Sequence, residues 1–168
     1  LSNAPYTDHV RIKGTGASGR EDGASVKLSW DRKGLRLQIE CRDDVFHQTL
    51  ADSGIWRGDS LQIAFDTDPD NMFEYDELTR RLSKKVTSLG FALSPKGPYA
   101  YRYRTFSESI LKTGNGTENL PFTAVRKDGV TRYDITVPWH QIGMKETEAV
   151  PGKKIGFSLL VNDHDGAG

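Results

Sequence analysis

Cysteine is nearly absent from this chain of 168 residues, since Cys41 is its one cysteine. An internal disulfide is therefore excluded, and cysteine usage does not indicate an oxidising or a reducing compartment. Cys41 continues an alternating apolar series that runs through Leu35, Leu37 and Ile39. That position predicts a small buried hydrophobic side chain on a strand rather than a reactive thiol.

An excess of charge of one sign and long apolar runs are also missing. Lys plus Arg number 23 and Asp plus Glu number 23, so the formal net charge is zero. Such a chain has no general attraction to nucleic acid or to an anionic membrane, and we expect neither as a partner. No apolar run approaches the roughly 18 residues of a membrane-spanning helix. The length fits one domain with a core that needs no disulfide support.

The two ends of the sequence lead to expectations about its boundaries. No signal peptide is recognisable, and the opening Ser2-Asn3-Ala4 resembles a cloning tag. The turn-like ending leads us to expect that the natural chain continues beyond Gly168. We therefore expect an N-terminal segment over residues 1–24, partly tag and flexible. Residues 25–168 would form the folded module, truncated at its C-terminal end.

Apolar and polar residues alternate with a period of two along most of the chain, as they do in strands with one buried face. Turn residues rich in glycine, proline and aspartate separate these segments, and helical patterning is weak. The sequence therefore predicts an all-β fold, an antiparallel β-sandwich with little helix. The clearest segments are "SVKLSW" (25–30), "LRLQIEC" (35–41), "DSLQIAFD" (59–66), "SLGFALS" (88–94), "YAYRYRT" (99–105), "FTAVRKDGVTRYDITVP" (122–138) and "KIGFSLLVND" (154–163).

Patterns typical of enzymes are weak. "GTGASG" (14–19) has the letters of a dinucleotide-binding fingerprint, but no strand precedes it and no helix begins within it. The four histidines lack the spacing of a helical zinc site, and a single cysteine cannot complete a zinc cluster. No nucleophile lies on a recognisable catalytic turn. None of these patterns identifies a catalytic site. A pair of facing carboxylates for glycoside cleavage is the alternative that the sequence leaves open.

An acidic window follows the segment 59–66. Asp66, Asp68 and Asp70 stand at positions 1, 3 and 5 of a twelve-residue window, and Glu77 stands at position 12. This is the spacing of oxygen ligands in a helix-loop-helix calcium site, although a strand enters the loop here and Asn71 replaces the usual glycine. The crowded carboxylates repel one another, and a hard cation would relieve the repulsion. Bound calcium is one expectation, and an exposed acidic turn without a cation is the other.

The three tryptophans fall into two groups. Trp30 continues an apolar strand face, and Trp139 follows Pro138 at a strand end, so both are expected to pack against the core. Trp56 lies in the polar segment "GIWRGD", and no alternation directs it inward. An exposed indole offers a flat apolar face on which a sugar ring stacks. A loop tryptophan folded back over a sheet edge is the alternative.

Four stretches, read in order, resemble the family-9 carbohydrate-binding modules and the related DOMON-like sandwiches. They carry the resemblance over most of residues 25–166: "SVKLSWDRKGLRLQIECRDDVFHQ", "IWRGDSLQIAFDTDPDN", "YDITVPWHQIG" and "KIGFSLLVNDHDG". The resemblance implies a β-sandwich that binds sugars without cleaving them, and Trp56 matches the first of two clamping tryptophans. It also implies calcium near the acidic loop and a place beside secreted glycoside hydrolases or other polysaccharide-acting enzymes.

The chain departs from the family pattern at three places. The second clamping tryptophan of the family follows an Asn-Asp turn, where this sequence stops. Gln62 stands where family members carry a sugar-bonding glutamate, and its amide still forms hydrogen bonds but without charge. Leu160 stands where a glutamine contributes, and its side chain forms no hydrogen bond.

We predict an ancillary carbohydrate-binding module located outside the cytoplasm, in an extracellular or periplasmic setting. Trp56 would be the stacking surface, with Arg57, Gln62 and Asn162 as hydrogen-bonding residues around it, and Asp59 would fix the loop. Its partners would be an oligo- or polysaccharide and other domains of the same polypeptide. Two alternatives are a structural module whose Trp56 is covered by a neighbouring domain, and a haem-binding DOMON-like domain.

Overall fold

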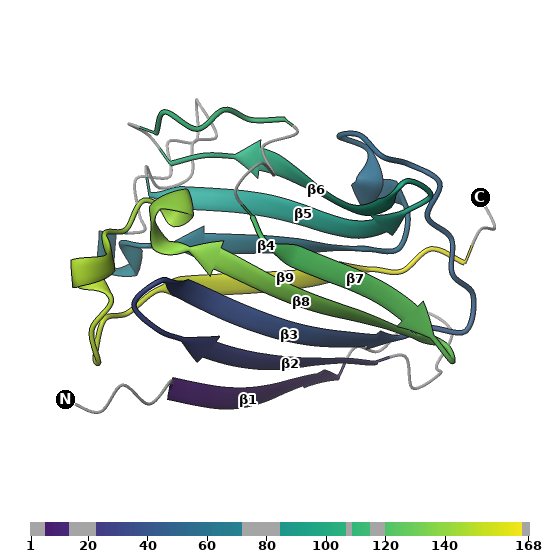
Figure 1. The fold of residues 1–168 in the computed structure, drawn as a ribbon, viewed down its shortest axis with the longest axis horizontal. Helices are drawn as coiled ribbons and strands as arrows, with labels where there is room; N and C mark the ends of the chain where they lie inside the picture. The colour runs from purple at the N-terminus through teal and green to yellow at the C-terminus, as the bar shows by residue number, and fades with distance from the viewer. Residues whose placement is uncertain (1–5, 14–22, 72–84, 107–108, 115–119, 166–168) are drawn as a thin grey trace.

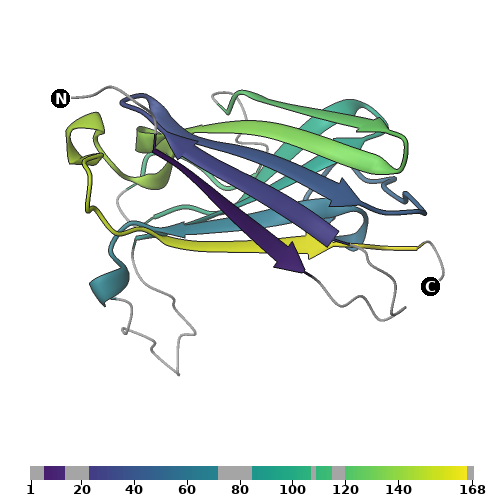
Figure 2. The ribbon, with the colours of Figure 1, turned by 90° about the horizontal axis from the view of Figure 1, so that it is seen from below.

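The computed structural model describes residues 6–13, 23–71, 85–106, 109–114 and 120–165. The strands are β1 (Tyr6–Lys13), β2 (Gly23–Trp30), β3 (Gly34–Arg42), β4 (Ser60–Asp66), β5 (Val86–Ser94), β6 (Gly97–Arg104), β7 (Phe122–Lys127), β8 (Val130–Pro138) and β9 (Gly156–Asn162). They form two sheets, with the orders β1-β2-β3-β8-β7 and β6-β5-β4-β9 (Figure 1). All pairs of neighbouring strands are antiparallel. The two sheets lie one over the other, so the predicted all-β sandwich is confirmed (Figure 2).

Helical structure in the described residues is limited to short 3-10 turns. They are η1 (Ile55–Arg57), η2 (Pro69–Asn71), η3 (Trp139–Ile142) and η4 (Glu146–Glu148). None of the described helices is long and apolar enough to span a membrane. The expectation of little helix is therefore met in this part of the chain.

The hairpins expected from the alternating segments are present as β2–β3, β5–β6 and β7–β8. The β7–β8 hairpin turns at Asp128 and Gly129, whose φ angles are 51° and 71°. Two successive positive φ angles are typical of a type I′ turn, which fits the twist of the two flanking strands. The Asp-Gly pair in the sequence is thus sufficient to predict this connection.

Strand β1 lies within the N-terminal segment, residues 1–24, which the sequence analysis separated from the sandwich. It pairs with β2 from Tyr6 opposite Trp30 to Lys13 opposite Gly23. Its apolar alternation is limited to Val10 and Ile12, and this short pattern did not identify a strand. The glycine-rich stretch 14–19 lies outside the described residues.

The core lies between the two sheets. Leu37, Ile39, Ile63 and Phe91 are among the side chains that are completely or almost completely buried there. The predictions for Cys41, Trp30 and Trp139 are confirmed. Burial raises the pKa of the Cys41 thiol to about 12, which keeps it protonated and inert. Trp30 packs against the core, and the buried Trp139 donates its indole N–H to the carbonyl of Asp31 at 2.9 Å.

Candidate functional site

The outer face of the sheet β6-β5-β4-β9, directed away from the core, gathers the predicted sugar-contacting residues. One row of this face follows the register from Tyr101 through Gly90 and Gln62 to Leu160. Directly opposed residues in antiparallel strands share one face of a sheet, so these four positions form one line across it. The neighbouring row runs from Tyr99 through Ala92 and Ser60 to Asn162. Small and aromatic residues therefore make up much of this face.

Trp56 and Arg57 lie on η1, which contacts β4 and β5 and covers one end of this outer face. Ile55 anchors the turn because its side chain is fully buried. The side-chain amide of Gln48 donates to the carbonyls of Ile55 at 2.8 Å and of Asp59 at 3.2 Å. Trp56 itself remains 47% exposed, although it is a large apolar residue. We call this exposed indole the Trp56 platform.

The guanidinium of Arg57 lies over the Trp56 platform. Its Cζ atom is 5.2 Å from the centroid of the indole ring, which is within the range of a cation–π contact. The contact positions a positive charge beside the indole. The structure therefore brings together two of the four predicted residues directly.

Asp59 fixes the loop that carries the platform. One of its carboxylate oxygens accepts the backbone N–H of His47, and the other accepts the backbone N–H of His164 at 2.9 Å. Burial raises the pKa of Asp59, while the two backbone hydrogen bonds act in the opposite direction. The carboxylate thus ties the segment before β4 to the segment after β9. The predicted role of Asp59 in fixing the loop agrees with this geometry.

Gln62 and Asn162 lie on adjacent strands of the outer face, β4 and β9. The amide nitrogen of Asn162 donates to the hydroxyl of Ser60 at 3.0 Å, so one of its donors is already used. The side chain of Gln62 is half-buried and forms no hydrogen bond with the other described residues. Gln62 therefore keeps its full hydrogen-bonding capacity for a ligand.

The tyrosines of β6 belong to this site, and the sequence analysis did not include them. The rings of Tyr101 and Tyr103 have centroids 5.0 Å apart. Tyr103 crosses over Gly90, since a Cβ atom at residue 90 would lie 2.6 Å from its Cε2 atom. Burial raises the pKa of Tyr103 to about 12, and the backbone of Trp56 has a smaller opposite effect. The alternation of tyrosines in "YAYRYRT" was the signal that would have indicated an aromatic face.

The acidic residues proposed for calcium do not converge in the described part of the chain. Asp66 is buried, and one of its oxygens accepts the backbone N–H of Asp68 at 3.0 Å. The ammonium of Lys154 lies 3.5 Å from a carboxylate oxygen of Asp70. Glu77 lies outside the described residues. These side chains supply oxygen atoms, but the three described aspartates do not form a common coordination site by themselves.

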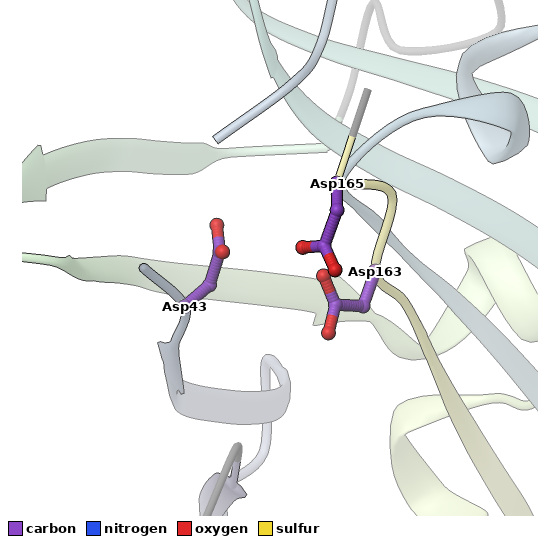
Figure 3. A group of neighbouring side chains, drawn as sticks. All are labelled: Asp43, Asp163 and Asp165. Carbon is purple, nitrogen blue, oxygen red and sulfur yellow. The ribbon is translucent and has the colours of Figure 1, made fainter. Parts of the chain in front are cut away.

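Asp43, Asp163 and Asp165 form a different acidic group, which the structure assembles from two distant segments (Figure 3). Ligand atoms from the three carboxylates lie within 4.8 Å of one another. Arg126 neutralises part of this charge, since its Nη1 atom lies 3.2 Å from an oxygen of Asp43. Burial raises the pKa of Asp43, and the charge of Asp165 adds to that effect. Sequence spacing gave no indication of this group, because Asp43 is far from Asp163 and Asp165 in the sequence and only the fold brings them together.

The methionines offer no described haem ligand. Met144 is buried in the core, and Met72 lies outside the described residues.

The family described as carbohydrate family 9 binding domain-like matches residues 2–168, so the chain belongs to this family. Two structures of a carbohydrate binding module family 9 (CBM9) from Caldicellulosiruptor kristjanssonii are similar to it. One, in complex with cellotriose, is 18% identical with a TM-score of 0.62, and the match covers 88% of this chain and 61% of the chain in that structure. The other, in complex with glucose, is 17% identical with a TM-score of 0.63, and the match covers 88% of this chain and 62% of the chain in that structure. No curated protein matches the chain.

Family membership confirms the resemblance stated from the sequence. The family consists of non-catalytic carbohydrate-binding domains, which agrees with the prediction that the module is not an enzyme by itself. At these identities the two structures support the fold alone. The chain spans about three fifths of the length of each of them.

Proposed function

We propose that this module binds carbohydrate on the outer face of the sheet β6-β5-β4-β9. The observation that carries the proposal is the Trp56 platform, a 47% exposed indole beside a face of small and aromatic residues. An exposed indole offers a flat apolar face with a polar edge, and a sugar ring stacks on such a face. Two relatives of the same fold, solved with cellotriose and with glucose, support the choice of ligand class.

In this proposal a sugar ring stacks on Trp56 while its hydroxyl groups meet polar side chains. Gln62 offers both a donor and an acceptor, and Arg57 offers donors from the rim. Asn162 contributes its remaining capacity beyond the bond to Ser60. One stacked ring with a few solvent-facing hydrogen bonds gives weak binding, because each such bond replaces one with water.

We further propose that the module is ancillary to a polysaccharide-acting enzyme outside the cytoplasm. Its partners would then be the polysaccharide and other domains of the same polypeptide. Membership in a carbohydrate-binding family supports this setting.

The test is a glycan-binding screen that compares wild type with Trp56→Ala and Trp56→Phe. Trp56→Ala removes the stacking surface, and we expect a loss of roughly 1–2 kcal/mol, about five- to thirtyfold in Kd. Trp56→Phe should retain part of the affinity because it keeps an aromatic face. Val125→Ala is the matched control, since Val125 is also exposed but lies on β7 of the other sheet. If folded wild type binds no glycan, the alternative of a structural module with Trp56 covered by a neighbouring domain replaces this proposal.

Calcium remains a separate proposal for Asp66, Asp68, Asp70 and Glu77. Calcium should then raise the thermal midpoint of the wild type, and an Asp68→Asn, Asp70→Asn double variant should lose most of that increase. Asp163→Asn, Asp165→Asn is the matched control, because it removes the same charge at another acidic group. A calcium-dependent increase that survives in the first double variant would contradict the proposal.

A further inference from the structure

The guanidinium of Arg57 has an unused binding capacity. Its one contact with another described residue is the cation–π contact with Trp56, and it has no hydrogen bond or ion pair among them. Arg57 is exposed, so a ligand can reach it. A guanidinium presents several N–H donors in a planar fork that fits a carboxylate in a bidentate way. The platform therefore combines a stacking surface with a site for an anion.

The acidic residues near the platform do not neutralise Arg57. Asp59 is buried, and both of its oxygens accept backbone N–H groups from other segments. Asp52 is exposed and accepts the backbone N–H of Gly54 at 2.6 Å. Burial raises the pKa of Tyr99 and Tyr103, and the negative charge of Asp52 adds to this effect. Asp52 therefore acts on the tyrosines of the site.

The central row of the outer face contains no carboxylate that would repel an anion. The row across it consists of Tyr101, Gly90, Gln62 and Leu160. Gln62 is neutral at the centre of that row and can donate through its amide. A second cation, Arg104, lies opposite Ser88 in the register but is engaged by other groups. Among the described residues, Arg57 is thus a cation with free donors next to the stacking surface.

We propose that the site prefers sugars that carry a carboxylate, namely uronic acids, and that Arg57 pairs with that carboxylate. This preference rests on the proposed carbohydrate-binding function and gives it a substrate class. The sugar ring stacks on Trp56, and the Arg57 side chain, which has no competing ion pair among the described residues, turns its donors to the carboxylate. Gln62 then meets the hydroxyl groups along the sheet.

The experiment is a pair of calorimetric or NMR titrations with glucuronic acid and glucose, which differ in whether carbon 6 is a carboxylate. At low ionic strength we expect glucuronic acid to bind about fivefold more tightly, and we expect added salt to reduce this ratio. Arg57→Gln should bring the ratio of the two affinities close to one. Arg32→Gln is the matched control: it removes one positive charge in the β2–β3 turn, at the opposite end of the sandwich from η1 (Figure 1), and should preserve the ratio.

The outcomes separate this preference from the proposed function itself. Equal binding of the two sugars by wild type, or an equal loss for both in Arg57→Gln, would overturn the preference and leave carbohydrate binding intact. A ratio that falls in Arg32→Gln as far as in Arg57→Gln would also overturn it, since net charge alone would then explain the effect. Absence of binding to either sugar and to their oligosaccharides would overturn both proposals.

Discussion

The two outward faces of the sandwich carry different kinds of side chain. On the sheet β1-β2-β3-β8-β7, charged side chains alternate with core residues and pair with one another across β3 and β8. Arg36 lies 2.5 Å from Asp134, and Arg132 lies 2.9 Å from Glu40. The outward face of β6-β5-β4-β9 carries small, amide and aromatic residues instead, and η1 covers one end of it.

On the first face the charged groups pair with one another, whereas on the second face several polar groups have no such partner among the described residues. Paired charges leave little capacity for a ligand, and water covers them at little cost. The other face keeps an exposed indole, and the amide of Gln62 and the guanidinium of Arg57 form no hydrogen bond or ion pair with the other described residues. Among the described residues these three groups lie on one side of the molecule, so substitutions on the two sides should differ in kind.

The largest effect is expected at Asp59, which holds the platform against the sheet. Asp59→Ala leaves the backbone N–H groups of His47 and His164 without their acceptor, and we expect a loss of about 2–3 kcal/mol in the free energy of unfolding. Amide hydrogen exchange at these two residues should accelerate. Sugar binding should weaken with it, because the platform loses its support.

Asp134→Ala is the control for Asp59→Ala, since it removes an acid from the self-paired face. We expect it to cost about 0.5 kcal/mol and to leave exchange at His47 and His164 unchanged. Equal destabilisation by the two substitutions, measured by urea unfolding, would contradict the proposed difference between the two faces.

A smaller effect is expected at Gly90, where Tyr103 crosses the outer face. Gly90→Ala places a methyl group 2.6 Å from Cε2 of Tyr103 and 3.1 Å from Cδ1 of Ile55, so both must move. We expect a cost of about 1–2 kcal/mol in stability, together with weaker sugar binding. Gly23→Ala is the control, since a methyl group there meets nothing within 4 Å. Calorimetric unfolding and binding that are unchanged in Gly90→Ala would show that the tyrosine face does not support the platform.

The sequence predicts the local parts of this comparison well and the distant contacts poorly. Alternation placed the hairpins, whereas the lack of alternation around Trp56 left open whether its side chain is exposed or folded over a sheet edge. The link from Asp59 to His164 spans 105 residues, and no local pattern indicates which distant amide a carboxylate will bind. The same holds for Asp43 and Asp163, which meet through the sandwich topology. Tyr101 and Tyr103 were visible as a pattern, but their nearness to η1 follows from folding alone.

The smallest effect is expected for the ion pair of Arg36 and Asp134, and its dependence on pH tests whether this face is truly self-satisfied. The hydrogen bond from Arg36 lowers the pKa of Asp134 below its ordinary value of 3.8. A carboxylate with a lowered pKa in the folded state contributes stability above its unfolded pKa, and loses it as the pH falls through the folded value.

Arg36→Gln should therefore destabilise the protein by about 0.5 kcal/mol at neutral pH, a small value because the side chains are 54% and 36% exposed and the pair is screened by solvent. Below the pH at which Asp134 takes up its proton in the folded protein, the variant and the wild type should have the same stability. Arg32→Gln should show no such convergence, since Arg32 has no ion pair among the described residues. A difference between Arg36→Gln and wild type that stays constant from neutral to acidic pH would mean that Arg36 acts through packing of its aliphatic chain rather than through Asp134.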